Sequence, residues 1–177
     1  SPGTLLVQTA PAVGVNGMIF AVDTTSGAVS TLANAAGISA TADPRFQKVS
    51  FTVSDGTTIS SYSHTLSNGV NNTVAPTIFP DKCRWDMATT STVYCAVPDS
   101  DPGTSYLDAW HMGTQSLADD IWSINFATGV STLVAVPGSR QGGQTSDIFE
   151  MAISPNEHYL AYTTKTARAL WGVLLPQ

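Results

Sequence analysis

The sequence predicts an all-β fold, a β-propeller of about four four-stranded antiparallel blades. The first observation behind this prediction is a segment that occurs twice, 102 residues apart. Ile19–Gly27 is followed by Val29–Leu32, and Ile121–Gly129 is followed by Val130–Leu133. Each copy reads as an alternating apolar strand, a polar turn ending in glycine, and a returning Val-Ser-Thr-Leu strand. That pattern is typical of a β-hairpin.

The second observation is the spacing of aromatic residues in equivalent strands. Trp122 and Trp171 lie 49 residues apart, and Phe20 precedes Trp122 by 102, which is about two such steps. A period of about 40 to 50 residues built only of short strands is typical of a propeller blade.

The expected strands fall into one domain, residues 1–177, with blades over approximately residues 1–35, 36–80, 81–137 and 147–177. In chain order they are Thr4–Thr9, Met18–Asp23, Ala28–Leu32, Ile38–Ala42, Lys48–Ser54, Thr57–His64, Asn72–Phe79, Lys82–Met87, Thr92–Val97, Asp120–Phe126, Val130–Val136, Phe149–Ser154, Tyr159–Thr164 and Ala169–Leu175. In this alignment the first blade lacks its innermost strand and the last blade lacks its outermost strand.

Two motifs carry a family resemblance. Ile153–Tyr162, followed by Leu170 and Trp171, resembles the blade of TolB-like and related WD40-like propellers. Asp81–Trp85 together with Thr92–Pro98 is similar to uncharacterised, surface-located propeller proteins of candidate-phylum bacteria. The resemblance is good over residues 80–175 and loose before them. Asn-Glu-His stands where the family has Asp-Gly, so we expect a turn of another type there.

The resemblance implies a propeller of six to eight blades with an N-terminal anchor. We therefore expect this chain to be an incomplete, C-terminal part of a larger propeller, although four blades can also close into a ring. Open blade faces are apolar, and soluble proteins rarely expose large apolar patches. A protein partner is expected to cover them, either the N-terminal part of the same propeller or another copy.

Composition excludes some partners and indicates a compartment. Lys and Arg number 7 against 13 acidic residues, and the net charge of −6 argues against nucleic acid. Only 11% of the residues are charged, and the usage of Ser, Thr, Gly, Ala and Val is that of a β-rich secreted or surface protein. We expect an extracytoplasmic location and, since no long apolar run occurs, no membrane span in this chain.

Cys83 and Cys95 lie on consecutive expected strands. A hairpin centred near Thr89 places them opposite each other, where a disulfide is feasible and would indicate an oxidising compartment. The alternative is two free, buried core cysteines.

The excursion Asp99–Asp119 is the strongest candidate for a partner or ligand surface, because long loops of a scaffold often carry recognition. Its carboxylates are potential ligands of Ca²⁺, although an EF-hand pattern is absent and we expect no cofactor. The alternative is a solvated acidic loop whose aromatic residues pack on a neighbouring blade. The candidate residues are Asp99, Asp101, Tyr106, Asp108, Trp110 and His111.

Catalysis finds no support in the sequence, which contains no nucleophile elbow, metalloprotease helix or phosphate-binding loop. His64, His111 and His158 are evenly spaced, but they fall at different points of their blades, so no metal site is expected. The prediction is a non-catalytic protein-interaction or assembly platform of an exported or cell-surface protein. The alternatives are a carbohydrate- or small-ligand-binding propeller, and the propeller part of a hydrolase whose catalytic domain lies outside this chain.

Overall fold

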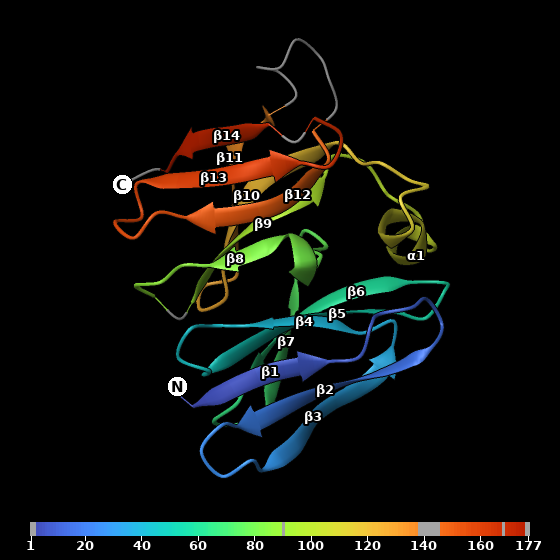
Figure 1. The fold of residues 1–177 in the computed structure, drawn as a ribbon, viewed down its shortest axis with the longest axis vertical. Helices are drawn as coiled ribbons and strands as arrows, with labels where there is room; N and C mark the ends of the chain where they lie inside the picture. The colour runs from blue at the N-terminus through green and yellow to red at the C-terminus, as the bar shows by residue number, and fades with distance from the viewer. Residues whose placement is uncertain (1–2, 90, 138–145, 168, 176–177) are drawn as a thin grey trace.

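The computed structural model describes residues 3–89, 91–137, 146–167 and 169–175. These residues form four antiparallel sheets that follow one another along the chain, with the helix α1 (Tyr106–His111) beside them (Figure 1). Each sheet corresponds to one of the predicted blades, and we number the blades 1 to 4 in chain order. Blades 2 and 3 have four strands each, and blades 1 and 4 have three.

The strands agree closely with those predicted. In chain order they are β1 (Thr4–Gln8), β2 (Asn16–Asp23), β3 (Val29–Ala36), β4 (Ser39–Ala42), β5 (Lys48–Ser54), β6 (Ile59–Thr65), β7 (Val70–Val74), β8 (Cys83–Trp85), β9 (Thr92–Pro98), β10 (Asp119–Asn125), β11 (Val130–Ala135), β12 (Ile148–Ile153), β13 (Tyr159–Thr164) and β14 (Leu170–Leu174).

The predicted strand Asn72–Phe79 is too long at its C-terminal end, and the next predicted strand, Lys82–Met87, is too long at its N-terminal end. The strand expected over Asn72–Phe79 ends at Val74, two residues before Pro76, which lacks the N–H that a sheet ladder needs. The next one starts with the short 3-10 helix η1 (Pro80–Lys82), and extended pairing begins only at Cys83.

The repeated hairpin has the turn chemistry that the sequence predicts. The Asp23 carboxylate accepts hydrogen bonds from the amides of Thr25 and Ser26, each at 2.8 Å. In the second copy the Asn125 side chain accepts from Ala127 and Thr128 in the same way. The closing glycines, 27 and 129, have φ of 73° and 74°, a conformation that only glycine adopts without steric cost.

The turn between β12 and β13 contains a non-glycine residue in the left-handed conformation. The Glu157 amide donates to the Ser154 carbonyl at 2.8 Å, and Glu157 has a φ of 57°. Phe46 has a φ of 54° in the turn between β4 and β5. Glu157 thus takes a left-handed conformation that glycine adopts readily, and the expectation that this turn differs in type from the family's turn stays a prediction.

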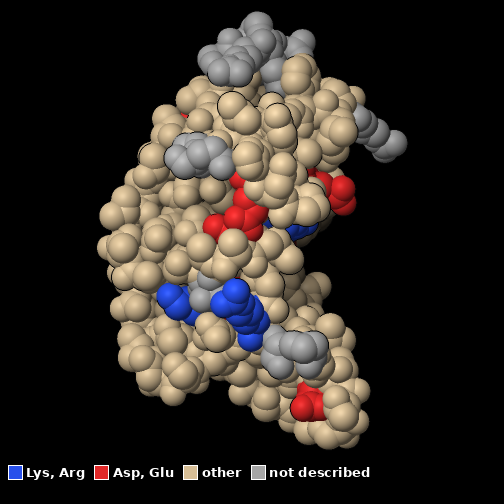
Figure 2. Space-filling model, turned by 90° about the vertical axis from the view of Figure 1, so that its left-hand side faces the viewer, with Lys and Arg blue, Asp and Glu red and all other residues tan. Residues whose placement is uncertain are grey.

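Apolar side chains between successive blades form the core. Ile19, Ile38 and Val49 belong to the cluster between blades 1 and 2. The corresponding clusters between blades 2 and 3 and between blades 3 and 4 contain Ile124 and Leu160, respectively. The stacked blades curve into a crescent whose visible face is mostly uncharged (Figure 2).

The predicted disulfide is confirmed. Cys83 and Cys95 are paired across β8 and β9 and are bonded to each other. The bridge lies in the apolar cluster between blades 2 and 3, and both residues are fully buried. The alternative of two free core thiols is therefore wrong.

Candidate interaction site

The excursion between β9 and β10 folds back onto the blades instead of projecting into solvent. Three residues of α1 are buried: Tyr106, Leu107 and Trp110, with exposed fractions of 1%, 6% and 3%. They are adjacent or lie three or four residues apart, a spacing that places side chains on the same side of a helix. The Tyr106 ring centroid lies 4.2 Å from that of Phe79, which precedes η1. Tyr106 and Trp110 are therefore core residues, and the prediction that they form an exposed partner surface is wrong.

Trp110 is held by a buried cluster of charges that the sequence did not reveal. The Lys82 ammonium donates to Asp119 Oδ2 at 2.7 Å and to Asp147 Oδ1 at 2.9 Å. The Trp110 indole N–H donates to the same Asp147 oxygen at 2.8 Å. Lys82 also lies 4.7 Å from the centre of the Trp110 ring, and the Lys165 ammonium donates to the Trp110 carbonyl. The cluster joins η1, β10, the segment before β12, and α1.

The ion-paired groups Lys82, Asp119 and Asp147 carry one excess negative charge when both acids are ionised. Asp119 Oδ1 and Asp147 Oδ2 are buried without a hydrogen-bond partner among the described residues. Burial raises the pKa of Asp119 to about 6, although the Lys82 ammonium acts to lower it. Burial and the nearby carboxylates also raise the pKa of Tyr106. This cluster is closed to solvent and ties the insertion to blades 3 and 4.

The remaining predicted site residues lie in different places. Asp108 is half-buried, and its Oδ1 accepts from the Val13 amide at 3.1 Å, which fastens α1 to the loop between β1 and β2. His111 is exposed, with Nε2 at 3.5 Å from Asp81 Oδ2. Asp99 and Asp101 are exposed on the loop that leaves β9.

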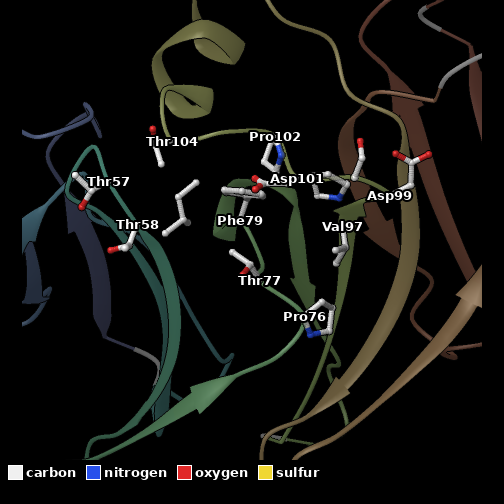
Figure 3. A pocket seen from close by; sticks show the side chains of 13 residues that line it. Thr57, Thr58, Pro76, Thr77, Phe79, Val97, Asp99, Asp101, Pro102 and Thr104 are labelled. Atoms are coloured by element: carbon white, nitrogen blue, oxygen red, sulfur yellow. The ribbon is translucent and has the colours of Figure 1, made fainter.

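Asp99 and Asp101 line a cleft of about 560 Å³ between blades 2 and 3. In Figure 3, Thr57 and Thr58 form one side, Asp99 lies on the other, and Phe79 lies between them. The lining combines hydroxyl and carboxylate groups with apolar side chains, among them prolines and Phe79. Among the described residues no Lys or Arg lines the cleft, and Asp99 and Asp101 make the net charge of this lining negative. Desolvation and the Asp99 carboxylate raise the pKa of the nearby Asp120.

The acidic side chains considered as potential Ca²⁺ ligands do not form a ligand set in the structure. Within the described residues, no three His, Cys, Asp or Glu side chains form a group able to hold a metal ion. Asp108 is engaged by Val13, as described above. His64 instead contacts Asn71 of β7, with Nδ1 at 2.7 Å from Oδ1. The Ca²⁺ site considered for the acidic loop therefore has no assembled ligand set.

Comparison with solved structures identifies the architecture. TolB from Acinetobacter baumannii superposes over 99% of the chain with a TM-score of 0.57 and 12% identity. The β-propeller domain of the Trilobed protease from Pyrococcus furiosus superposes over 97% with a TM-score of 0.52 and 6% identity. The chain has the β-propeller fold. An oligogalacturonate lyase in complex with manganese is also similar, over 97% of the chain, with a TM-score of 0.55 and 11% identity.

The propeller of this chain matches only part of each similar structure. It spans 41% of the TolB chain, 56% of the protease domain and 49% of the lyase. The arrangement fits the expectation of an incomplete propeller. Neither a protein-family model nor a curated protein matches the sequence, so the resemblance to candidate-phylum surface proteins stays a prediction.

The residues that organise the insertion were missed by sequence reasoning. Lys82, Asp119 and Asp147 are 37 and 28 residues apart in sequence, and no short motif links them. Asp119 is the first residue of β10 and is buried. An available signal was the scarcity of charge: in a chain with 7 Lys and Arg, a lysine between a proline-containing turn and a buried cysteine is a candidate for a buried ion pair.

Proposed function

We propose that the chain is a non-catalytic propeller module that assembles with other protein surfaces through the outer faces of its end blades. The observation that carries this proposal is a contrast between middle and end blades. No residue of β5, β9 or β10 is exposed, because each of these strands has a neighbouring blade on both sides. The end blades have such a neighbour on one side only.

The uncovered faces of the end blades are apolar. On blade 1, Leu5 and Val7 are 56% and 45% exposed, while Leu6 between them packs toward blade 2. On blade 4, Leu170 and Leu174 are 75% and 68% exposed, and Val173 packs toward blade 3. Apolar faces of this kind mark interaction sites more often than free surface. The covering partner is a further blade-like sheet, from the same propeller or from another copy.

An exported or cell-surface location belongs to the same proposal. The bond between Cys83 and Cys95 supports it, since disulfides persist in oxidising compartments. In the described part of the chain, no helix has the length and apolar character of a membrane-crossing segment.

Light scattering of the purified chain over a range of concentrations tests the assembly. Wild type is expected to associate, and Val7→Thr combined with Leu5→Thr is expected to shift it toward monomer. Val70→Thr is the matched control, because Val70 is 46% exposed but lies on β7, away from both end faces. A wild-type chain that stays monomeric and does not bind a hydrophobic dye contradicts the proposal.

The cleft between blades 2 and 3 favours a second candidate function, the binding of a carbohydrate or another small ligand. Its mixture of hydroxyl and carboxylate groups with apolar side chains resembles the general composition of ligand sites. Glycan-array binding that disappears in Asp99→Ala would support this function, and an array without signal would exclude carbohydrates. Trp110 is buried and is unsuitable for this test.

A further inference from the structure

The cleft between blades 2 and 3 carries negative charge that no described cation neutralises. Asp99 and Asp101 belong to its lining, and the described lining residues include no Lys or Arg. The ion pairs within the described ranges have Lys82 and His111 as their cations, and neither Asp99 nor Asp101 takes part in them. Clefts lined by charges of one sign concentrate ligands of the opposite sign. The charge of the lining therefore favours a cationic ligand.

Asp120 adds a third carboxylate beside this cleft. It stands opposite Val97 in the pairing of β9 with β10, and Asp99 follows Val97 two residues later, on the same side of the chain. The Asp99 amide donates to the Ala118 carbonyl at 2.8 Å, so the ladder continues past the end of β9. Val97 belongs to the cluster between blades 2 and 3. Both carboxylates therefore lie on the face of blade 3 that looks toward blade 2, and burial and the Asp99 carboxylate raise the pKa of Asp120.

The polar groups on the blade 2 side of the cleft act as hydrogen-bond acceptors. The Thr57 hydroxyl donates to Asp55 Oδ1 at 2.7 Å, and the Thr58 hydroxyl donates to Asp55 Oδ2 at 3.3 Å. A hydroxyl has one proton and two lone pairs, and an ionised carboxylate has lone pairs only. Both sides of the cleft thus offer acceptors, and a matching ligand supplies donors. Ammonium and guanidinium groups have donors and no acceptor.

The apolar part of the lining suits an alkyl stem better than a sugar ring. Phe79 is 4% exposed, and its ring centroid lies 4.2 Å from that of Tyr106, so its ring is already packed. Neither Trp nor Tyr is among the described lining residues, which leaves no open aromatic face for a sugar to stack on. The other apolar residues of the lining are Ile59, Pro76, Val97, Pro98 and Pro102.

We propose that the cleft binds an organic cation with an apolar stem, the chemistry that the arginine or lysine side chain of an extended peptide provides. The charged head donates to Asp99 and Asp101, and the methylene groups lie against Val97 and the prolines, as Lys and Arg stems do on apolar surfaces. The cleft measures about 560 Å³, within the range of about 300–1,000 Å³ typical of ligand pockets. The inference rests on ligand binding in this cleft, the second candidate function, and names the class of ligand.

The test compares two tripeptides that differ in charge alone. Ala-Arg-Ala, acetylated at its N-terminus and amidated at its C-terminus, is titrated into the full chain by isothermal calorimetry. The matched peptide has citrulline in place of arginine, which keeps the shape of the side chain and removes its charge. We expect saturable binding of the arginine peptide and binding of the citrulline peptide weaker by about tenfold or more.

Competition with agmatine, the arginine side chain without its peptide backbone, distinguishes two sources of the cation. Displacement of the arginine peptide by agmatine shows that a free organic cation is a sufficient ligand. Binding of the peptide without displacement shows that the cation is presented by a peptide. Both results agree with the proposed ligand class.

Two variants locate the binding. Asp99→Asn keeps the shape of an exposed side chain and removes its charge, so we expect the arginine peptide to bind about tenfold more weakly and its advantage over the citrulline peptide to shrink. Glu150→Gln is the matched control, because Glu150 is an exposed carboxylate on β12 of blade 4 and does not line the cleft. It should bind as wild type does.

Equal binding of the two peptides by wild type overturns the assignment of a cation, and so does equal weakening by Asp99→Asn and Glu150→Gln. A glycan-array signal that Asp99→Ala removes, without binding of the arginine peptide, rejects the cationic ligand and keeps the cleft as a ligand site. Absence of binding of both peptides and of any array signal rejects the cationic ligand and the carbohydrate function together.

Discussion

Replacing Asp119 by asparagine tests whether the buried charge cluster makes stability depend on pH. The Asp119 oxygen Oδ2 accepts from Lys82 and from the Ile148 amide, while Oδ1 has no partner among the described residues. Asparagine is nearly isosteric with aspartate, so its amide oxygen can keep both hydrogen bonds and its NH₂ group takes the orphan position. The variant thus changes the charge with little change in shape.

The magnitude follows from the pKa. Burial raises the pKa of Asp119 from 3.8 to about 6 in the folded chain. A group with a raised pKa stabilises the fold fully below its unfolded value, and this contribution is lost as pH rises through the folded value. Each pKa unit corresponds to 1.36 kcal/mol, so wild type loses up to about 3 kcal/mol between pH 4 and pH 7 through this group. Asp119→Asn does not titrate and avoids this loss.

Urea unfolding at pH 4, 5, 6 and 7, followed by tryptophan fluorescence, measures the effect. The difference in unfolding free energy between variant and wild type should move in favour of the variant as pH rises, with most of the change between pH 4 and pH 6. Asp101→Asn, at an exposed carboxylate, controls for the loss of one negative charge. The same pH profile in Asp119→Asn and wild type would refute the reasoning.

Three further outcomes are expected. Cys83→Ala combined with Cys95→Ala should lower the unfolding free energy by about 3 kcal/mol, because the bridge closes a loop of separation 12; reduction of wild type should reproduce most of this loss in denaturant titrations. Trp110→Ala should lower the free energy of unfolding by about 3–5 kcal/mol, because it removes a buried side chain and leaves Asp147 Oδ1 with one donor fewer. Thermal unfolding measures this loss. Gly129→Ala should cost about 1 kcal/mol because of its φ of 74°, whereas Gly172→Ala, with equally open space, should be nearly neutral in the same assay.

The fold could be predicted because its signals are local and repeated. Asp23 and Asn125 each begin a turn that a glycine closes, and both turns have the same hydrogen bonds. The cysteine pair could also be predicted, since a hairpin fixes which residues stand opposite each other. Period and turn chemistry thus determine the strands and their register within one blade.

The environment of the insertion could not be predicted, because it depends on contacts between distant segments. An aromatic residue in a long loop has the same sequence signature whether it faces solvent or the core. Trp110 is buried because Asp147 and Lys165, 37 and 55 residues away, offer partners to its indole N–H and its carbonyl. Such partners are brought near α1 only by the stacking of blades 3 and 4, which no local pattern encodes.

The surfaces proposed here lie far apart on the crescent, and this separation makes them independently testable. The cleft with Asp99 lies between blades 2 and 3, while Val7 belongs to β1 of blade 1, at one end of the stack. Substitutions at distant sites without shared partners have nearly additive effects. A loss of ligand binding caused by Val7→Thr would therefore require coupling through blade 2, which lies between the two surfaces.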